Sequence, residues 1–125
     1  LLGAVSRENM AHLMNLALGI IVPSIPVDGV VEASSIAALE GMSVGKPVIA
    51  SNIGGLAEII RHGDTGLLYD AGRADQLASL MQQIFDNDKL ASKIGQNARN
   101  YVLKKHSLEA WLNQIVEVYN NAISL

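Results

Sequence analysis

Residues 32–49 read EASSIAALEGMSVGKPVI, a stretch that joins a helix to a short buried strand. We expect the helix to return at about Ser34 and to end at Gly45, because glycine commonly terminates helices. Pro47 holds the backbone before it extended, and residues 48–50 are then wholly apolar. A helix that leads into such a strand is typical of a parallel sheet buried on both faces.

The same alternation of helix and strand continues on either side of this stretch. Upstream, Ser6 can cap a helix, and residues 20–22 form a β-branched strand. Downstream, residues 56–60 predict a short helix after a glycine loop, and residues 67–69 predict another strand. We expect residues 1–2 to finish a fourth strand.

From Asp75 onward the chain is predicted to be wholly helical, with a break at residues 86–89. Ser107 can cap the last helix. Three apolar residues recur at helical spacing and are expected to form its inner stripe: Trp111, Ile115 and Val118.

Short apolar strands that alternate with helices predict the α/β class, as a doubly wound, Rossmann-like parallel sheet. The 125 residues fit one compact domain. Only three or four strands can be found, so we expect the sheet to be incomplete on its N-terminal side. The chain begins with Leu rather than Met, and we interpret it as part of a longer protein.

The composition excludes several classes of protein. With 50% hydrophobic and 17% charged residues, the chain is too apolar to remain disordered. The net charge is −3 and the nine Lys and Arg are scattered, so nucleic acid is not an expected partner. Cysteine is absent, which excludes a disulfide framework and a thiol nucleophile. The longest apolar run, residues 16–23, is far short of the ~20 residues that span a bilayer.

Ligands of open parallel sheets bind beyond the carboxyl ends of the strands, and the quoted stretch follows one such end. The helix there opens with small residues whose amides can approach a ligand closely. Because helix N-termini attract anions, a phosphate would suit this end.

Glu32 and Glu40 stand in this otherwise small and apolar run. Eight helical residues rise about 12 Å, whereas glycoside hydrolases hold their two carboxyls ~5 to 9.5 Å apart. The two glutamates therefore fit opposite ends of an elongated polar molecule better than a single bond. Carboxylates accept hydrogen bonds from paired hydroxyls such as those of ribose, which indicates a ligand made of sugar, phosphates and ribose.

The ordered motifs resemble one known family. The motifs that carry this resemblance are, in order, PS at residues 23–24, a glutamate, seven residues, a second glutamate, GMSVGKPVIASNIGGLAEII and GDTGLLYDAG. With these motifs, the chain looks like the donor-binding domain of GT-B-fold retaining glycosyltransferases of family 4, the glycosyl transferases group 1. The resemblance runs from LLGAVS to KKHSLEAW and covers nearly the whole chain. It implies that residues 1–125 are a partial nucleotide-sugar-binding domain of a larger two-domain enzyme, which transfers a sugar to a carbohydrate or lipid-linked acceptor.

The resemblance also implies roles for individual residues. Glu32 would be the catalytic residue that contacts the donor sugar near the reacting carbon, Glu40 would bind ribose hydroxyls, and the backbone of Val5 would meet the nucleobase. A turn of small residues would contact sugar and diphosphate through its backbone: Ala33, Ser34, Ser35 and Ile36. No metal or other cofactor is expected, because arginine and lysine side chains upstream of Leu1 would neutralise the departing diphosphate.

Two departures from the family pattern are the sequence ASS where glycines are common, and the long loop SIPVDGVV. Serine reaches some glycine conformations only at a cost, so the donor fit is expected to differ in detail. Long loops of this kind look like those of members that assemble polysaccharides. We expect a cytoplasmic protein that can sit peripherally at a membrane.

Simpler interpretations stay open beside these. Glu32 could be a solvated loop glutamate, and Glu40 could be a buried acceptor for backbone amides. Gly54 and Gly55 are expected to be turn residues, and no histidine has a partner at metal-ligand spacing. A nucleotide-sugar epimerase of the same fold and a non-catalytic interaction module are the alternative functions. An exposed sheet edge would also favour self-association.

Overall fold

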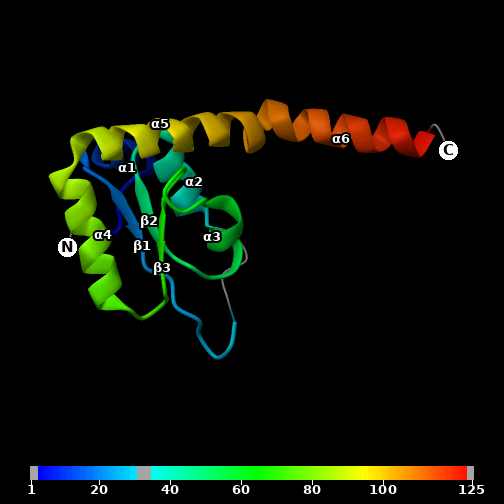
Figure 1. The fold of residues 1–125 in the computed structure, drawn as a ribbon. Helices are drawn as coiled ribbons and strands as arrows, with labels where there is room; N and C mark the ends of the chain where they lie inside the picture. Colours follow the sequence, from blue (N-terminus) through cyan, green and yellow to red (C-terminus); the bar gives the residue numbers. More distant parts are fainter. Residues whose placement is uncertain (1–2, 31–34, 124–125) are drawn as a thin grey trace.

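A computed structural model describes residues 3–30 and 35–123 of the chain. Three parallel strands form one sheet in the order β1-β2-β3, and Ile21, Ile49 and Leu67 are partners in register across it. The described elements, shown in Figure 1, follow one another as α1 (Arg7–Leu16), β1 (Ile20–Val22), α2 (Ile36–Ser43), β2 (Val48–Ser51), α3 (Gly54–Ile59), β3 (Leu67–Tyr69), α4 (Ala74–Asp86), α5 (Asp88–Lys105) and α6 (Leu108–Ile123). The predicted α/β class is confirmed.

The central strand β2 is buried on both of its faces, as its apolar residues 48–50 predict. Val48 and Ala50 belong to one core cluster, which α2, α3 and α5 complete with Met42, Leu56 and Val102 among others. Ile49, one residue out of phase, belongs to a second cluster with Leu67, Tyr69, Ile84 of α4 and Ile94 of α5. Helices therefore cover both faces of the sheet, which confirms the doubly wound arrangement (Figure 1).

Helix α2 is held in place by α5, the helix pair with the most extensive contact in the structure. Gly45 follows the C-terminal end of α2 with a positive φ of 75°. A Cβ atom added to Gly95 of α5 would overlap the carbonyl oxygen of Gly45, so only glycine permits this approach. Arg99, also on α5, donates to the carbonyl oxygen of Ser43 at the last turn of α2. These contacts fix α2, on which the candidate site depends.

The helix starts agree with the sequence predictions in part. Ser6 caps α1 by accepting a hydrogen bond from the Asn9 amide at 3.3 Å, as predicted. Helix α2 begins at Ile36, slightly later than expected. The expectation that Gly54 and Gly55 are turn residues is wrong, because they form the first turn of α3. Gly55 is buried there.

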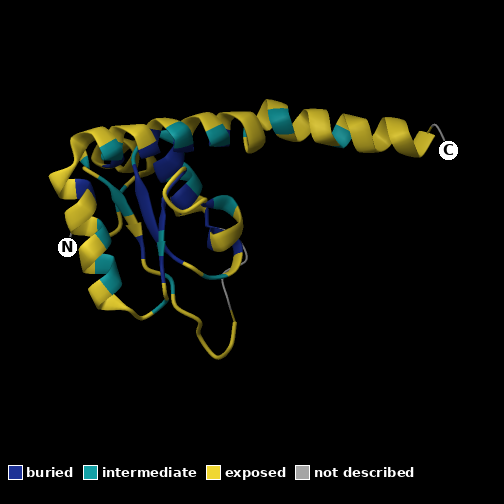
Figure 2. Ribbon diagram, in the orientation of Figure 1, coloured by how far each residue is buried: buried dark blue, intermediate teal, exposed yellow. Residues whose placement is uncertain are grey.

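The last helix, α6, contradicts the predicted inner stripe. Figure 1 shows α6 continuing beyond the body of the domain, and Figure 2 shows its surface as almost entirely exposed. The helix has no buried residue: Trp111 is 55% exposed and Val118 is 67% exposed, while Ile115 is half-buried. Periodicity shows that one helix face is apolar, but it does not show what covers that face.

The outer edge of the sheet and the length of the helices complete the description of the fold. The fourth strand expected at residues 1–2 lies outside the described residues, and within those described no strand pairs with the outer edge of β1. A search of the described helices finds none with the length and apolarity needed to cross a membrane.

Candidate functional site

The candidate site lies around α2, the helix that follows the loop after β1. Ser35 is buried and its hydroxyl caps α2 by accepting a hydrogen bond from the Ala38 amide at 3.4 Å. The first N–H groups of a helix have no partner within it, which leaves the amides of Ile36 and Ala37 without a helical acceptor. Such amides can bind an anion, and Ile36 is 70% exposed.

The backbone at Ser35 does not require glycine. Its φ is −117° and its ψ is 106°, an extended conformation that any residue adopts. The cost expected from a serine in place of glycine is therefore absent at this position. Glu32, Ala33 and Ser34, the other residues expected here, lie outside the described residues.

Helices α1 and α2 enclose a cavity of about 360 Å³, which we call the α1–α2 pocket. It contains Val5 and Glu40, two residues that the sequence analysis assigned to the nucleobase and to the ribose. The full lining is Val5, Arg7, Met10, Ala11, Met14, Glu40, Ser43 and Val44. Residues 35 apart in the sequence thus meet at one cavity, with mostly apolar walls and one charged group of each sign.

Glu40 is half-buried at this pocket. Its backbone carbonyl accepts hydrogen bonds from the Ser43 hydroxyl at 2.7 Å and from the Val44 amide at 3.2 Å. Its carboxylate accepts no hydrogen bond and forms no ion pair with the part of the chain that is described. No backbone amide of the described residues therefore uses the Glu40 carboxylate as an acceptor, contrary to the alternative that Glu40 serves backbone amides, and the carboxylate is available to a ligand.

The two halves of the candidate site lie at successive positions along α2. Four residues separate Ile36 from Glu40, which corresponds to a rise of about 6 Å. Neither Ser35 nor Ile36 lines the α1–α2 pocket. A ligand on α2 would place an anionic group at the helix N-terminus and a hydroxylated group beside Glu40.

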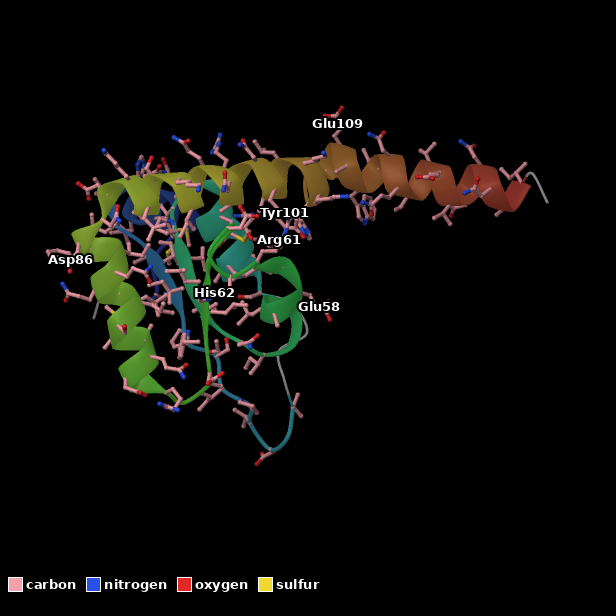
Figure 3. All side chains as sticks on the ribbon, viewed as in Figure 1. Glu58, Arg61, His62, Asp86, Tyr101 and Glu109 are labelled. Atoms are coloured by element: carbon pink, nitrogen blue, oxygen red, sulfur yellow. The ribbon has the colours of Figure 1, made fainter. Side chains whose placement is uncertain are left out.

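Three titratable or charged side chains outside the lining of this pocket have partners of their own: Arg61, His62 and Asp75. His62 accepts a hydrogen bond from the Leu68 amide through Nδ1 at 2.9 Å. Arg61 lies over the Tyr101 ring, 4.8 Å from its centre. Figure 3 labels these two residues close to each other. Asp75, at the start of α4, has its pKa lowered to about 2, chiefly by the hydrogen bond from Arg73. The described residues contain no group of three His, Cys, Asp or Glu side chains placed to hold a metal ion.

Comparison with known proteins then places the chain in a family. Residues 1–101 match the family model described as glycosyl transferases group 1. The chain belongs to this family. The resemblance inferred from the motifs is therefore confirmed, and the family is that of the retaining glycosyltransferases of family 4.

Individual relatives agree with this assignment. The chain is 33% identical over 119 residues to an uncharacterised glycosyltransferase of Methanocaldococcus jannaschii, covering 95% of this chain and 32% of that protein. The sucrose-phosphate synthase of Thermosynechococcus elongatus superposes with a TM-score of 0.84 at 31% identity, over 98% of this chain and 30% of that one. Anabaena HepE in complex with UDP-glucose superposes with a TM-score of 0.76 at 25% identity, over 87% and 29% of the two chains.

These group 1 relatives are considerably longer than the chain described here. It spans about a third of the M. jannaschii protein and of the sucrose-phosphate synthase. Its three-stranded sheet with flanking helices has the fold of the C-terminal domain of GT-B glycosyltransferases.

Proposed function

We propose that this chain is the donor-binding part of a larger two-domain glycosyltransferase, in which it contributes residues 1–125 of a nucleotide-sugar-binding domain. The enzyme would transfer a sugar from a nucleotide-sugar to a carbohydrate or lipid-linked acceptor with retention at the anomeric carbon. The observation that carries this proposal is the Glu40 carboxylate in the α1–α2 pocket, which has no partner among the described residues. Group 1 family membership and the UDP-glucose bound to Anabaena HepE support it.

The proposed donor would lie along α2. Its nucleobase would approach the backbone of Val5, and its ribose hydroxyls would donate to the Glu40 carboxylate. Its diphosphate would lie at the N-terminus of α2, where the unpaired amides and the positive end of the helix dipole favour negative charge. Ala33, Ser34, Ser35 and Ile36 would supply these backbone contacts to the diphosphate and the sugar.

In the proposed reaction, the bond from the anomeric carbon to the diphosphate breaks, and a bond to the acceptor oxygen forms on the same face of the sugar. The acceptor hydroxyl gives its proton to the phosphate oxygen that separates from the anomeric carbon, and the nucleoside diphosphate leaves. Glu32 would hold the sugar at the reacting carbon. Metal-independent transfer requires that arginine and lysine side chains outside this chain stabilise the leaving diphosphate.

Two exposed surfaces favour operation with a further domain. Exposed apolar residues, including Trp111 and Val118, recur along the whole of α6, whereas an ordinary surface exposes apolar residues singly and scattered. The outer edge of β1 is unpaired among the described residues. We propose that an upstream domain of the same protein accompanies this chain, and that the chain taken alone self-associates. A cytoplasmic enzyme, peripheral at a membrane when its acceptor is lipid-linked, fits this proposal.

The test uses the full-length protein with a panel of nucleotide-sugars and carbohydrate or lipid-linked acceptors. We expect acceptor-dependent release of nucleoside diphosphate, and a glycosidic product that keeps the donor's anomeric configuration in its NMR spectrum. Glu32→Gln should abolish transfer, whereas Asp88→Asn, an exposed carboxylate on α5, should leave it unchanged. Formation of an epimerised sugar without acceptor would favour the epimerase. Unchanged function in a protein with both Glu32 and Glu40 replaced would favour the non-catalytic module.

A further inference from the structure

Arg7 is the one arginine without an intramolecular partner in the described part of the chain. Arg61 and Arg73 form ion pairs with neighbouring aspartates at 3.5 Å and 2.7 Å, and Arg99 donates to a carbonyl oxygen of α2. Within residues 3–30 and 35–123, no hydrogen bond, ion pair or ring contact engages the Arg7 guanidinium. Its five N–H donors are therefore available to a ligand.

The fold directs Arg7 to the α1–α2 pocket. Arg7 is the first residue of α1, whose start is fixed by the Ser6 cap and whose inner side is anchored by buried Met14. Arg7 and Glu40 both line the pocket, yet they form no ion pair with each other. The two charges are thus separate and can meet different parts of one bound molecule.

The pocket offers Arg7 as its single cation. Met10, Ala11 and Met14 present apolar side chains, and the Ser43 hydroxyl is engaged by the carbonyl of Glu40. If Glu40 holds the ribose, as the proposed function requires, the base lies on the side of Val5 and Arg7. A flat base would then contact methionine side chains, which adapt well to irregular surfaces, and present its edge to the guanidinium.

The chemistry of that edge separates the four common bases into two classes. A guanidinium only donates hydrogen bonds. Guanine presents O6 and N7 as acceptors, and a keto pyrimidine presents O4. Adenine shares the N7 acceptor but carries an amino donor at position 6, and cytosine carries an amino donor at position 4. An amino group facing Arg7 would place two donors against each other without an acceptor between them.

We propose that Arg7 selects donors with a keto base, uracil or guanine, over donors with an amino base, cytosine or adenine. This assignment rests on the proposed nucleotide-sugar function and makes Arg7 a specificity-determining residue of the same site. Sequence reasoning did not single out Arg7, because a lone arginine at a helix start is ordinary.

Calorimetric titration of the full-length protein with UDP, CDP, GDP and ADP tests the proposal, because each keto base is paired with its amino counterpart. A good bidentate arginine–base pair discriminates by roughly 5- to 150-fold, so GDP should bind at least about 5-fold more tightly than ADP. UDP, whose base offers one acceptor, should bind about 5-fold more tightly than CDP. Arg7→Met should bring both ratios close to one. The matched control Arg73→Met removes the same charge at α4, away from the pocket, and should leave the ratios unchanged.

A second variant, Arg7→Lys, keeps the charge but loses the planar donor fork. We expect it to retain most of the affinity for UDP while the GDP to ADP ratio falls, because guanine uses two acceptors. Equal weakening of all four ligands by Arg7→Met would overturn base selection and leave only attraction to the diphosphate. Preference of the unaltered protein for CDP or ADP would also overturn it. Failure of the unaltered protein to bind any of the four would instead overturn the proposed function.

Discussion

Replacing Glu40 by alanine should weaken nucleotide binding while leaving the fold intact. The Glu40 carboxylate is half-buried and has no hydrogen-bond partner among the described residues, so its removal breaks no internal contact. A hydrogen bond to a charged group contributes about 1.5–3 kcal/mol. Loss of one such bond to a ribose hydroxyl corresponds to roughly 10- to 150-fold weaker binding, and loss of two bonds should lie at the upper end.

The assay is calorimetric titration of the full-length protein with UDP and with its 2′-deoxy and 3′-deoxy forms. If Glu40 accepts from the ribose diol, removing a hydroxyl weakens binding to the unaltered protein but changes little in the Glu40→Ala variant. The comparison thus forms a double-mutant cycle between the protein and the ligand. Asp88→Ala is the matched control, and thermal unfolding should show nearly the same midpoint for all three proteins.

Two results would refute this reasoning about Glu40. One is equal affinity of the unaltered protein and Glu40→Ala for UDP. The other is an equal penalty for the deoxy ligands in both proteins, which would mean that the hydroxyls are bound elsewhere.

Three further predictions concern the fold and its surfaces. Gly95→Ala should lower the free energy of unfolding by about 3 kcal/mol in urea titration, because the new Cβ meets the backbone of Gly45. Gly72→Ala, with open space around it and a φ of 82°, should lower it by only about 1–2 kcal/mol. Asp75 has a pKa of about 2 when folded, below its usual 3.8, so its ion pair with Arg73 contributes to stability above pH 3.8, and this contribution is lost as the pH falls toward 2. The melting temperature of Asp75→Asn should therefore converge with that of the unaltered chain over this interval. A difference that persists at pH 2 would contradict this. The isolated 125-residue chain should associate through the β1 edge, which is unpaired among the described residues, and a strictly monomeric species in light scattering would contradict this. The isolated chain should also show no sugar transfer, and measurable turnover would contradict that expectation.

Much of the fold could be predicted from local chemistry. The β-branched residues 20–22 and the apolar residues 48–50 after Pro47 are strands in the structure. The exposure of α6 could not be predicted, because the spacing of Trp111 and Val118 defines an apolar face but does not show what covers it. The start of α3 could not be predicted, because Gly54 and Gly55 favour turns locally, whereas tertiary packing places them in a helix.

Only part of the candidate site could be predicted from the sequence. The family resemblance pointed to Val5 and Glu40, and only the tertiary structure brings the two to one pocket. The role of Arg7 could not be predicted, because only the tertiary structure shows that its guanidinium has no partner among the described residues and is available to a ligand. Glu32, on which the proposed chemistry depends, lies outside the described residues, so its role stays a prediction.

A crystal structure of the full-length protein with bound UDP would test whether this chain is the donor-binding part. The account predicts uridine in the α1–α2 pocket, with its ribose hydroxyls within hydrogen-bond distance of the Glu40 carboxylate and its diphosphate at the N-terminus of α2. A nucleotide bound elsewhere, for example in the apolar groove that Ile21, Met81 and Phe85 line between β1 and α4, would contradict it.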